Sequence, residues 1–324
     1  MKIKEITRYF ESIAPLAYQE NYDNCGLQVG NPEAEVKAVL LTLDITEEVI
    51  DEAISKGANL IIAHHPLIFS PLKKITGTNI IERCLLKAIK NEIAIYAAHT
   101  NFDSITGGVN SKICEKLGLI NCSILSPVSG ELRKLAFFVP VEHAQKVREA
   151  LFLAGAGQIG NYDMCSFNIE GNGTFRAGTG ANPFVGEIGN MHIEPEIRVE
   201  TIFPKAIQGA VLTALLSSHP YEEVAYDIYP LDNKYKKIGM GMIGSLNEEI
   251  EAKEFLEKIK KTFMLESLRY SAIHKKYIKK VAVCGGSGGF LIKQAISANA
   301  DIFITGDIKY HNFFDAENKI IIAD

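Results

Sequence analysis

The sequence predicts an α/β protein whose core consists of two related α/β units, with an inserted α+β domain. Three observations predict this fold class. Strand-like apolar segments and amphipathic helix-like segments alternate over residues 36–100. The pattern changes at about residue 126 to hairpin- and loop-forming sequence, and it returns at about 237. A segment near the C-terminus, 294–307, resembles residues 52–65.

Composition limits the class of protein. The 324 residues are 47% hydrophobic and 23% charged, and no apolar run approaches the roughly 20 residues needed to cross a bilayer. We expect a soluble cytoplasmic protein without a membrane partner, because the first residues carry acids where a secretory signal is basic and then apolar. The six cysteines form no Cys-x-x-Cys pair. A net charge of −5 gives no reason to expect a nucleic-acid partner.

The first half of the chain predicts a parallel sheet covered on both faces. The first residues favour a helix, and residues 21–35 are rich in turn formers and read as a loop. Strands are expected at 36–44, 58–66 and 93–100, with helices at 46–57 and 78–92. Strict alternation of this kind is typical of parallel sheets.

The middle of the chain predicts a separate domain. Residues 133–156 read as a strand and a helix, and the Gly- and Asn-rich residues 170–190 as hairpins and mobile loops. A strand at 196–204, a helix at 206–220 and a strand at 221–231 follow. We therefore expect a core of residues 1–125 and 236–324, with an insert at 126–235.

The internal similarity relates the two parts of the core. It aligns residues of the first segment with identical residues of the second, among them Ala53, Ile54, Ser55 and Ala58 with Ala295, Ile296, Ser297 and Ala300. In this register Asp44 corresponds to Gly286, and the pair His64-His65 to Gly306-Asp307. Ligands of open parallel sheets gather at the carboxyl ends of strands, where these residues fall. Chance similarity of helix-to-strand turns is the alternative.

Two histidines end the apolar run "LIIAHHP". His64 and His65 can reach one centre only if the backbone turns there, which Pro66 favours. Histidines that bond to backbone groups are the alternative for the pair alone. The next strand also ends in candidate ligands, His99 and Asp103, and the two clusters together favour a site for zinc, manganese or iron. Two metal ions bridged by a carboxylate would activate a water molecule. His99 would then donate a hydrogen bond to one of the metal ligands or carry a proton.

A Gly-rich turn offers a second, weaker candidate site. In "VAVCGGSGGFLIKQAI" a strand, a turn and a helix follow one another, and Gly286 and Gly288 could contact a phosphate. Close packing explains these glycines equally well, and no nucleotide-binding motif is present. After the next strand come Asp307, Lys309, His311 and Asp315, which could line a pocket or cap a helix. His219 reads as a structural turn residue, and no serine or cysteine stands in a nucleophile-elbow context.

Six motifs, in this order, are similar to those of the Nif-three-like family, whose members are named type 2 homologues of GTP cyclohydrolase I. The motifs are "NYDNCGLQVG", "GANLIIAHHPLIF", "YAAHTNFDSITGGVN", "HPYEEVAYDIYPL", "VAVCGGSGG" and "ITGDIKYHNFFDAE". The resemblance covers almost the whole chain. It implies an α/β core with a dinuclear divalent-metal centre, an inserted domain of the PII-like, ferredoxin-like type, and a toroidal homohexamer.

Residue by residue, the resemblance places the metal ligands of the family on His64, His65 and Asp103. The family continues, after a strand like "KIIIAD", with a Gly-His pair and a glutamate, whereas the sequence given ends at Asp324. We expect a shortened chain rather than a depleted site, and in either case weaker metal binding from three of the five ligands. His311 precedes the position of the pair and is not a usual ligand of the family.

The leading functional hypothesis is a metal-dependent hydrolase in which a metal-bound water attacks a nucleotide or another phosphorylated small molecule. It rests on the His and Asp residues at strand ends beside a Gly-rich turn. The alternative is a non-catalytic, regulatory hexameric ring that binds metal and recruits a partner through the insert. Binding of nucleic acid in the ring is a third reading, and the acidic net charge counts against it.

Overall fold

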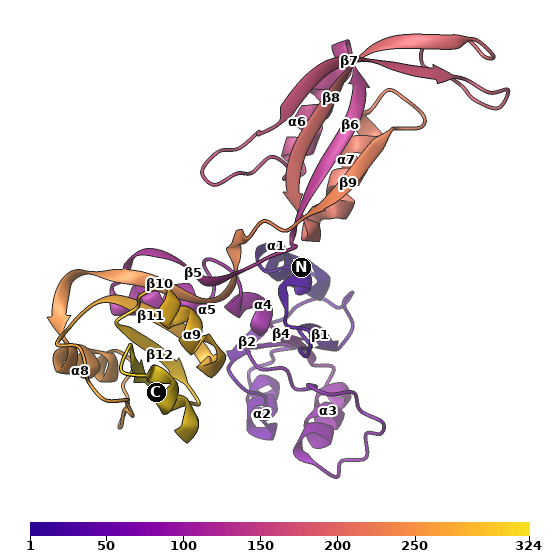
Figure 1. Cartoon of the computed structure of the whole chain (residues 1–324). Coiled ribbons are helices and arrows are strands. Elements are labelled where there is room, and N and C mark those ends of the chain that lie inside the picture. The colour runs from indigo at the N-terminus through magenta and orange to yellow at the C-terminus, as the bar shows by residue number, and fades with distance from the viewer. The chain divides into compact units, whose positions relative to one another are not determined.

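A computed structural model describes all 324 residues (Figure 1). The chain forms two compact units. Residues 1–127 and 236–324 form the first, here called the core unit, and residues 128–235 form the second, the inserted unit. No helix combines the length and the apolar character needed to cross a membrane.

The first sheet of the core unit consists of four strands in the order β1-β4-β3-β2. These are β1 (Gly26–Val29), β2 (Val39–Thr42), β3 (Leu60–Ala63) and β4 (Ala94–Ala97). Strands β2, β3 and β4 are parallel, as the alternating pattern predicts. The helices of this half are α1 (Ile3–Ile13), α2 (Glu47–Ser55), α3 (Ile80–Lys90), α4 (Thr100–Asp103) and α5 (Val109–Leu117), with a short helix at Leu16–Tyr18.

Strands β3 and β4 are buried at every residue because helices cover both faces of the sheet. Ile61 and Ile95 pack in one cluster with residues of α2 and α3. Leu60 and Tyr96 point to the opposite face and pack in a cluster with Ile3 of α1. Alternate residues thus serve opposite faces, which explains the uninterrupted apolar runs.

Strand β1 corrects the sequence prediction in two ways. It lies within residues 21–35, which were expected to form a loop, and it runs antiparallel to β4. The sheet is therefore mixed rather than wholly parallel. Gly30 directly follows the strand with φ +111°, and a Cβ there would lie 2.5 Å from the Cβ of Ala94. The short strand was missed because its flanking residues are strong turn formers and its pairing partner lies far along the chain.

The second sheet of the core unit has the order β13-β12-β11-β10-β5. Its strands are β5 (Ile120–Val128), β10 (Tyr235–Glu251), β11 (Tyr277–Ser287), β12 (Ile302–Gly306) and β13 (Ile321–Ala323). Strands β11, β12 and β13 are parallel, and β10 is antiparallel to β11. The helices are α8 (Ala252–Thr262) and α9 (Ile292–Ser297), with short helices at Gly289–Leu291 and Tyr310–Ala316.

The two sheets share one arrangement. In each, three parallel strands follow one another in chain order, β2-β3-β4 in the first and β11-β12-β13 in the second. The similar sequences of 52–65 and 294–307 fall on α2-β3 and on α9-β12. The core is thus an α/β structure of two like halves.

Strands β5 and β10 are neighbours in the second sheet, and they approach each other closely. A Cβ at Gly239 of β10 would lie 2.1 Å from the carbonyl oxygen of Ser126 in β5.

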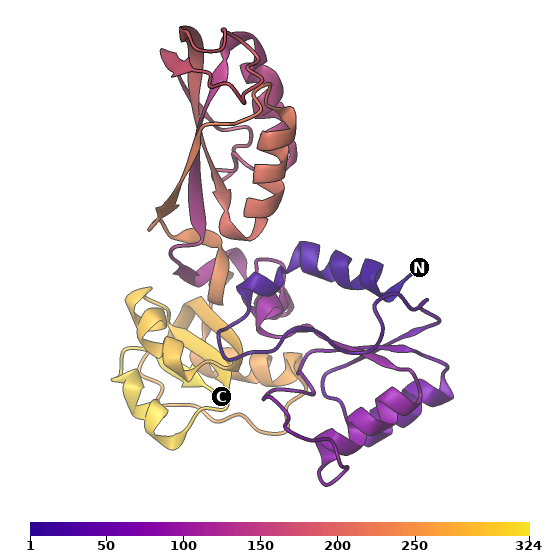
Figure 2. The ribbon, with the colours of Figure 1, turned by 90° about the vertical axis from the view of Figure 1, so that its right-hand side faces the viewer.

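The inserted unit has the element order β-α-β-β-α-β. Its elements are β6 (Leu132–Pro140), α6 (Ala144–Leu153), β7 (Phe167–Arg176), β8 (Met191–Pro204), α7 (Gln208–Ser218) and β9 (Tyr226–Leu231), with short helices at Val141–His143 and Lys205–Ile207. The sheet order is β7-β8-β6-β9 with antiparallel pairing throughout, a ferredoxin-like arrangement. Both helices cover the same face of this sheet (Figure 2). That the unit is of the PII type stays a prediction.

The Gly- and Asn-rich residues of the inserted unit belong partly to a long hairpin. The sequence predicts hairpins and mobile loops over residues 170–190, and the consecutive strands β7 and β8 do form an antiparallel hairpin, in which β7 extends to Arg176 and pairs with β8 over its whole length. A long antiparallel ladder overrides the low strand propensity of Gly171, Asn172 and Gly173. Gly173 also leaves room for a neighbouring carboxylate, because a Cβ there would lie 2.1 Å from an oxygen of Glu196.

Candidate metal centre

Three histidines meet at the carboxyl ends of β3 and β4. His64 and His65 follow β3, and His99 follows β4 and precedes α4. The strands are parallel neighbours, with Ala63 paired to Ala97, so their ends lie at the same edge of the sheet. The nitrogens that could bind a metal all lie within 4.8 Å of one another. The ring centroids are 5.0, 5.1 and 5.4 Å apart.

Adjacent histidines reach the same place because the backbone leaves the regular strand geometry at His64. The N–H groups of His64 and His65 both donate to the β2 side, to the carbonyls of Thr42 (3.2 Å) and Leu43 (2.9 Å). In a regular parallel strand, consecutive N–H groups point to opposite neighbours. Here they point to the same neighbour, which fits the turn expected before Pro66.

Each histidine uses its Nδ1 for a bond to the protein. These bonds run from His64 to the Ala98 carbonyl (2.8 Å), from His65 to the Asp44 carboxylate (2.7 Å) and from His99 to the Asp23 carboxylate (2.9 Å). All three partners can only accept, so each Nδ1 carries a hydrogen. Each neutral ring then has its lone pair on Nε2. Such bonds orient metal-binding histidines in known sites.

Asp103 adds a carboxylate to the cluster, and one of its oxygens has no hydrogen-bond partner. It ends α4, and its Oδ1 lies 3.8 Å from Nε2 of His64. The same Oδ1 is buried and has no hydrogen-bond partner. Burial raises the pKa of Asp103 to about 6, although the nearby His99 lowers it. A cation can satisfy a buried oxygen that has no protein donor, so the residues present fit a divalent metal.

Asp23 anchors the far side of the cluster. Its side chain is fully buried, and its carboxylate accepts hydrogen bonds from His99, from the Thr100 hydroxyl and from the Cys25 thiol. Burial alone would raise the pKa of Asp23, but the bonds from His99, Thr100 and Cys25 outweigh it and hold the pKa well below its usual value. In turn, burial would lower the pKa of His99, but the bond to Asp23 raises it. Burial lowers the pKa of His64, which favours the neutral, metal-binding ring.

The structure thus brings together His64, His65, His99 and Asp103. Sequence reasoning missed Asp23 and Asp44 as the partners of His99 and His65. Asp44 ends the predicted strand 36–44, so a polar side chain at that edge was a usable signal. Asp23 gave no such signal, because it lies in a turn-rich segment 76 residues from His99.

The Gly-rich turn is explained mainly by packing. The N–H of Gly288 donates to the Thr305 hydroxyl, which donates in turn to the Gly286 carbonyl, each at 2.8 Å. A Cβ at Gly288 would lie 2.5 Å from the Thr305 Oγ1. The phosphate contact predicted for Gly288 therefore lacks a free donor, and the contact predicted for Gly286 stays a prediction.

The remaining predicted residues lie outside the histidine cluster. Asp307, Lys309, His311 and Asp315 follow β12 of the other sheet and are exposed. His219 is buried in the inserted unit, where its Nε2 donates to the Phe138 carbonyl (2.9 Å) and its Nδ1 accepts from the N–H of Tyr221 (3.1 Å). Its structural role agrees with the sequence prediction.

The fold and the cluster define an α/β protein with imidazole and carboxylate groups gathered at one sheet edge. The family model for Duf34/NIF3 (NGG1p interacting factor 3) matches residues 1–324. The chain belongs to this family. It is 44% identical over 314 residues to the "GTP cyclohydrolase 1 type 2 homolog" of Bacillus subtilis, covering 97% of this chain and 84% of that one.

Solved structures agree with this assignment. A Bacillus cereus protein related to NIF3 is similar with a TM-score of 0.88 and 46% identity, covering 100% of this chain and 87% of the other. A Staphylococcus aureus protein is similar with a TM-score of 0.77 and 29% identity, covering 100% of this chain and 86% of the other. The two-part α/β core predicted from the sequence is thus confirmed as the fold of this family.

Proposed function

We propose that the chain binds divalent metal at the histidine cluster and acts as a metal-dependent hydrolase on a nucleotide or another phosphorylated small molecule. One observation carries the proposal. The Nδ1 atoms of His64, His65 and His99 are all bonded to acceptors, which leaves the Nε2 lone pairs of the three neighbouring rings free, and the unpaired Oδ1 of Asp103 lies 3.8 Å from Nε2 of His64.

The donor set suits zinc, manganese or iron. Nε2 of His64, His65 and His99 and the carboxylate of Asp103 would hold the ion. When bound, a divalent ion supplies Lewis acidity, which activates water and offsets the negative charge of a phosphate. Compared with the sequence hypothesis, His99 gains a role as a ligand. A second ion per subunit and the homohexameric ring both stay predictions.

The residues of the chain contribute orientation and selectivity. Asp23 and Asp44 fix the rings of His99 and His65, so that little reorganisation is needed when the ion binds. Two exposed rings, Tyr22 and Phe69, lie on the segments that carry Asp23 and His65, with centroids 6.1 Å apart. Aromatic faces of this kind stack on bases, which supports a nucleotide as substrate. The name of the Bacillus subtilis relative, which refers to GTP, points to the same class.

Metal content tests the binding part of the proposal. Wild-type protein and His65→Ala are purified in parallel, dialysed against zinc or manganese, and measured by elemental analysis. We expect the variant to lose most of the bound metal. The matched control is His311→Ala, an exposed histidine outside the cluster, which should keep it. Equal metal content in the three proteins would exclude the site.

A turnover screen tests the hydrolase part separately. Metal-loaded wild-type protein is incubated with nucleoside mono-, di- and triphosphates and with sugar phosphates, and released phosphate and altered bases are measured. Activity that depends on metal and is lost in His64→Ala supports the proposal. Metal binding without any turnover would leave a metal-binding protein and contradict hydrolysis.

A further inference from the structure

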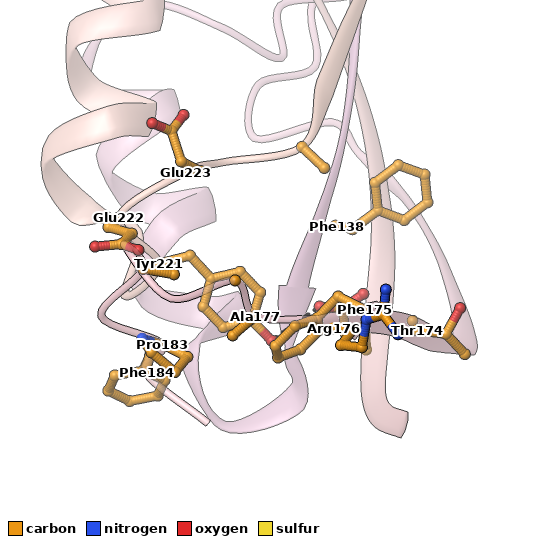
Figure 3. A pocket seen from close by; sticks show the side chains of 15 residues that line it. Phe138, Thr174, Phe175, Arg176, Ala177, Pro183, Phe184, Tyr221, Glu222 and Glu223 are labelled. Carbon is orange, nitrogen blue, oxygen red and sulfur yellow. Dashed lines mark hydrogen bonds between the residues drawn. The ribbon is translucent and has the colours of Figure 1, made fainter. Parts of the chain in front are cut away.

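The inserted unit contains a pocket of about 480 Å³, within the range of small-molecule sites. All of its lining residues belong to this unit. They come from β6, from the end of β7 and the loop that follows it, from β8, and from the segment that precedes β9 (Figure 3). The histidine cluster belongs to the core unit, so the pocket is made of different residues.

Four aromatic side chains are among the residues that line the pocket. Phe138, Phe175, Phe184 and Tyr221 line it, and Figure 3 shows the Tyr221 ring between those of Phe184 and Phe175. The centroid of Tyr221 lies 6.2 Å from that of Phe184 and 6.4 Å from that of Phe175. Several ring faces round one space attract a cation or an aromatic ring.

A buried carboxylate lies among these rings. Glu196 is only 9% exposed, and its Oε1 accepts a hydrogen bond from the Tyr221 hydroxyl at 2.9 Å. Oε2 packs against Gly173, which makes room for it because a Cβ there would lie 2.1 Å from this oxygen. Lys and Arg side chains form no ion pair with Glu196, although Arg176 also lines the pocket. A buried carboxylate with one neutral partner is incompletely compensated.

The other charged residues that line the pocket give it a net negative charge. Three acidic residues, Glu196, Glu222 and Glu223, line it together with one basic residue, Arg176. A second guanidinium, that of Arg198, lies 5.8 Å from the centroid of the Phe138 ring. Glu222 accepts a hydrogen bond from the N–H of Asn182 at 2.8 Å, which ties the loop after β7 to the pocket. An excess of negative charge disfavours phosphate and carboxylate ligands. It favours a cation with an apolar or aromatic body.

We propose that this pocket binds a small organic amine, protonated at neutral pH, whose nitrogen pairs with Glu196 while its apolar body lies among Phe138, Phe175, Phe184 and Tyr221. The Tyr221 hydroxyl holds one oxygen of Glu196 in place and leaves the other for the ligand. The carboxylate and the ring faces act together on the same charge.

Three matched ligands test the charge requirement on the full-length wild-type protein. Phenethylamine carries the cation, 2-phenylethanol is neutral with a similar body, and phenylacetate carries the opposite charge. Binding is measured by saturation-transfer NMR and calorimetry at neutral pH. For so few atoms we expect phenethylamine to bind with a Kd on the order of 1 mM, and the other two about tenfold or more weakly. No binding of phenethylamine, or equal binding of all three, overturns the proposal.

Variants of Glu196 and Gly173 test whether the carboxylate binds the amine. Glu196→Gln keeps the shape and the acceptor for Tyr221 but removes the charge, and it should weaken phenethylamine binding about tenfold or more. Gly173→Ala, which displaces the carboxylate, should have a similar effect and serves as a second variant should Glu196→Gln fail to fold. The control, Glu170→Gln, lies on β7 outside the pocket and should bind as wild type does. Unchanged binding in folded Glu196→Gln overturns the assignment. Phenethylamine binding that is retained in His65→Ala shows that this pocket binds independently of the histidine cluster.

Discussion

The carboxylate of Asp23 accepts a hydrogen bond from Nδ1 of His99 at 2.9 Å, although 76 residues separate the two along the chain. Asp23 has no exposed side-chain area, and the Thr100 hydroxyl also donates to it. The bond fixes the tautomer of His99, whose ring centroid lies 5.1 Å from that of His64 and 5.4 Å from that of His65. A fully buried acid thus fixes the orientation of one ring of the cluster.

The first prediction concerns the acids behind the histidines. Asp44→Asn should weaken zinc binding about 10- to 100-fold, because the carboxylate that orients His65 is lost. Asp44 is well exposed, so the fold should persist. Affinity is measured by competition with a chelator. Asp51→Asn, an exposed acid on α2, is the control, and equal affinity of both variants and wild type would refute the orienting role.

The second prediction concerns the dependence of stability on pH. Glu82 is buried and accepts hydrogen bonds from the N–H and hydroxyl groups of Thr76 and Thr78 and from the side chain of Asn79. Bonds from the Thr78 and Thr76 N–H groups hold the pKa of Glu82 at about 2, below its ordinary 4.5. Its stabilising effect is therefore complete above pH 4.5 and is lost as the pH falls toward 2.

Urea denaturation of wild type and Glu82→Gln at a series of pH values measures this effect. The difference in the free energy of unfolding should be constant near neutral pH and shrink below pH 4.5. Glu257→Gln replaces an exposed acid of α8 and should show no such trend. A difference that stays constant down to pH 2 would contradict the role of Glu82.

The third prediction concerns an unsatisfied hydroxyl. Tyr96 of β4 is fully buried against Phe10, and its hydroxyl has no hydrogen-bond partner. Tyr96→Phe keeps the ring and removes the unpaired group, so it should raise the free energy of unfolding by about 1 kcal/mol. Denaturant unfolding checks this, with the exposed Tyr9→Phe as a near-neutral control. A destabilised Tyr96→Phe would mean that the hydroxyl does have a partner in solution.

The fourth prediction concerns the end of β1. Gly30→Ala should destabilise the core unit by about 3 kcal/mol, because φ is +111° and the new Cβ would lie 2.5 Å from the Cβ of Ala94. Gly57→Ala is the matched control. Its φ is +65° with open space around the Cβ, so it should cost only about 1 kcal/mol. Thermal and denaturant unfolding distinguish the two, and equal costs would show that the close approach to Ala94 relaxes freely.

The sequence was informative where structure follows from local pattern. The buried strands β3 and β4 are continuous apolar runs because both their faces are covered, and this pattern is visible in the chain. His64, His65, His99 and Asp103 could be grouped from their positions after these strands, since parallel strands end at a common edge. The repeat of α2-β3 in α9-β12 was visible as well.

The features that could not be predicted from the sequence depend on contacts between segments that are distant along the chain. Strand β1 is short and lies among turn residues, and only its ladder with β4 defines it. Strand β7 is rich in Gly and Asn, and its ladder with β8 decides its conformation. The Asp23–His99 bond and the pocket around Glu196 arise from tertiary contacts as well. Local propensity carries no information about such contacts.

The close approach of Gly239 to Ser126 shows how the chain accommodates its insert. Strands β5 and β10 lie side by side, and the whole inserted unit takes the place that the turn of a β-hairpin would occupy. The entropy of closing such a loop rises by only about 0.6 kcal/mol for each doubling of its length. A folded domain can therefore replace a tight turn at small cost to the sheet that carries it, and a short turn in its place should leave the hairpin paired.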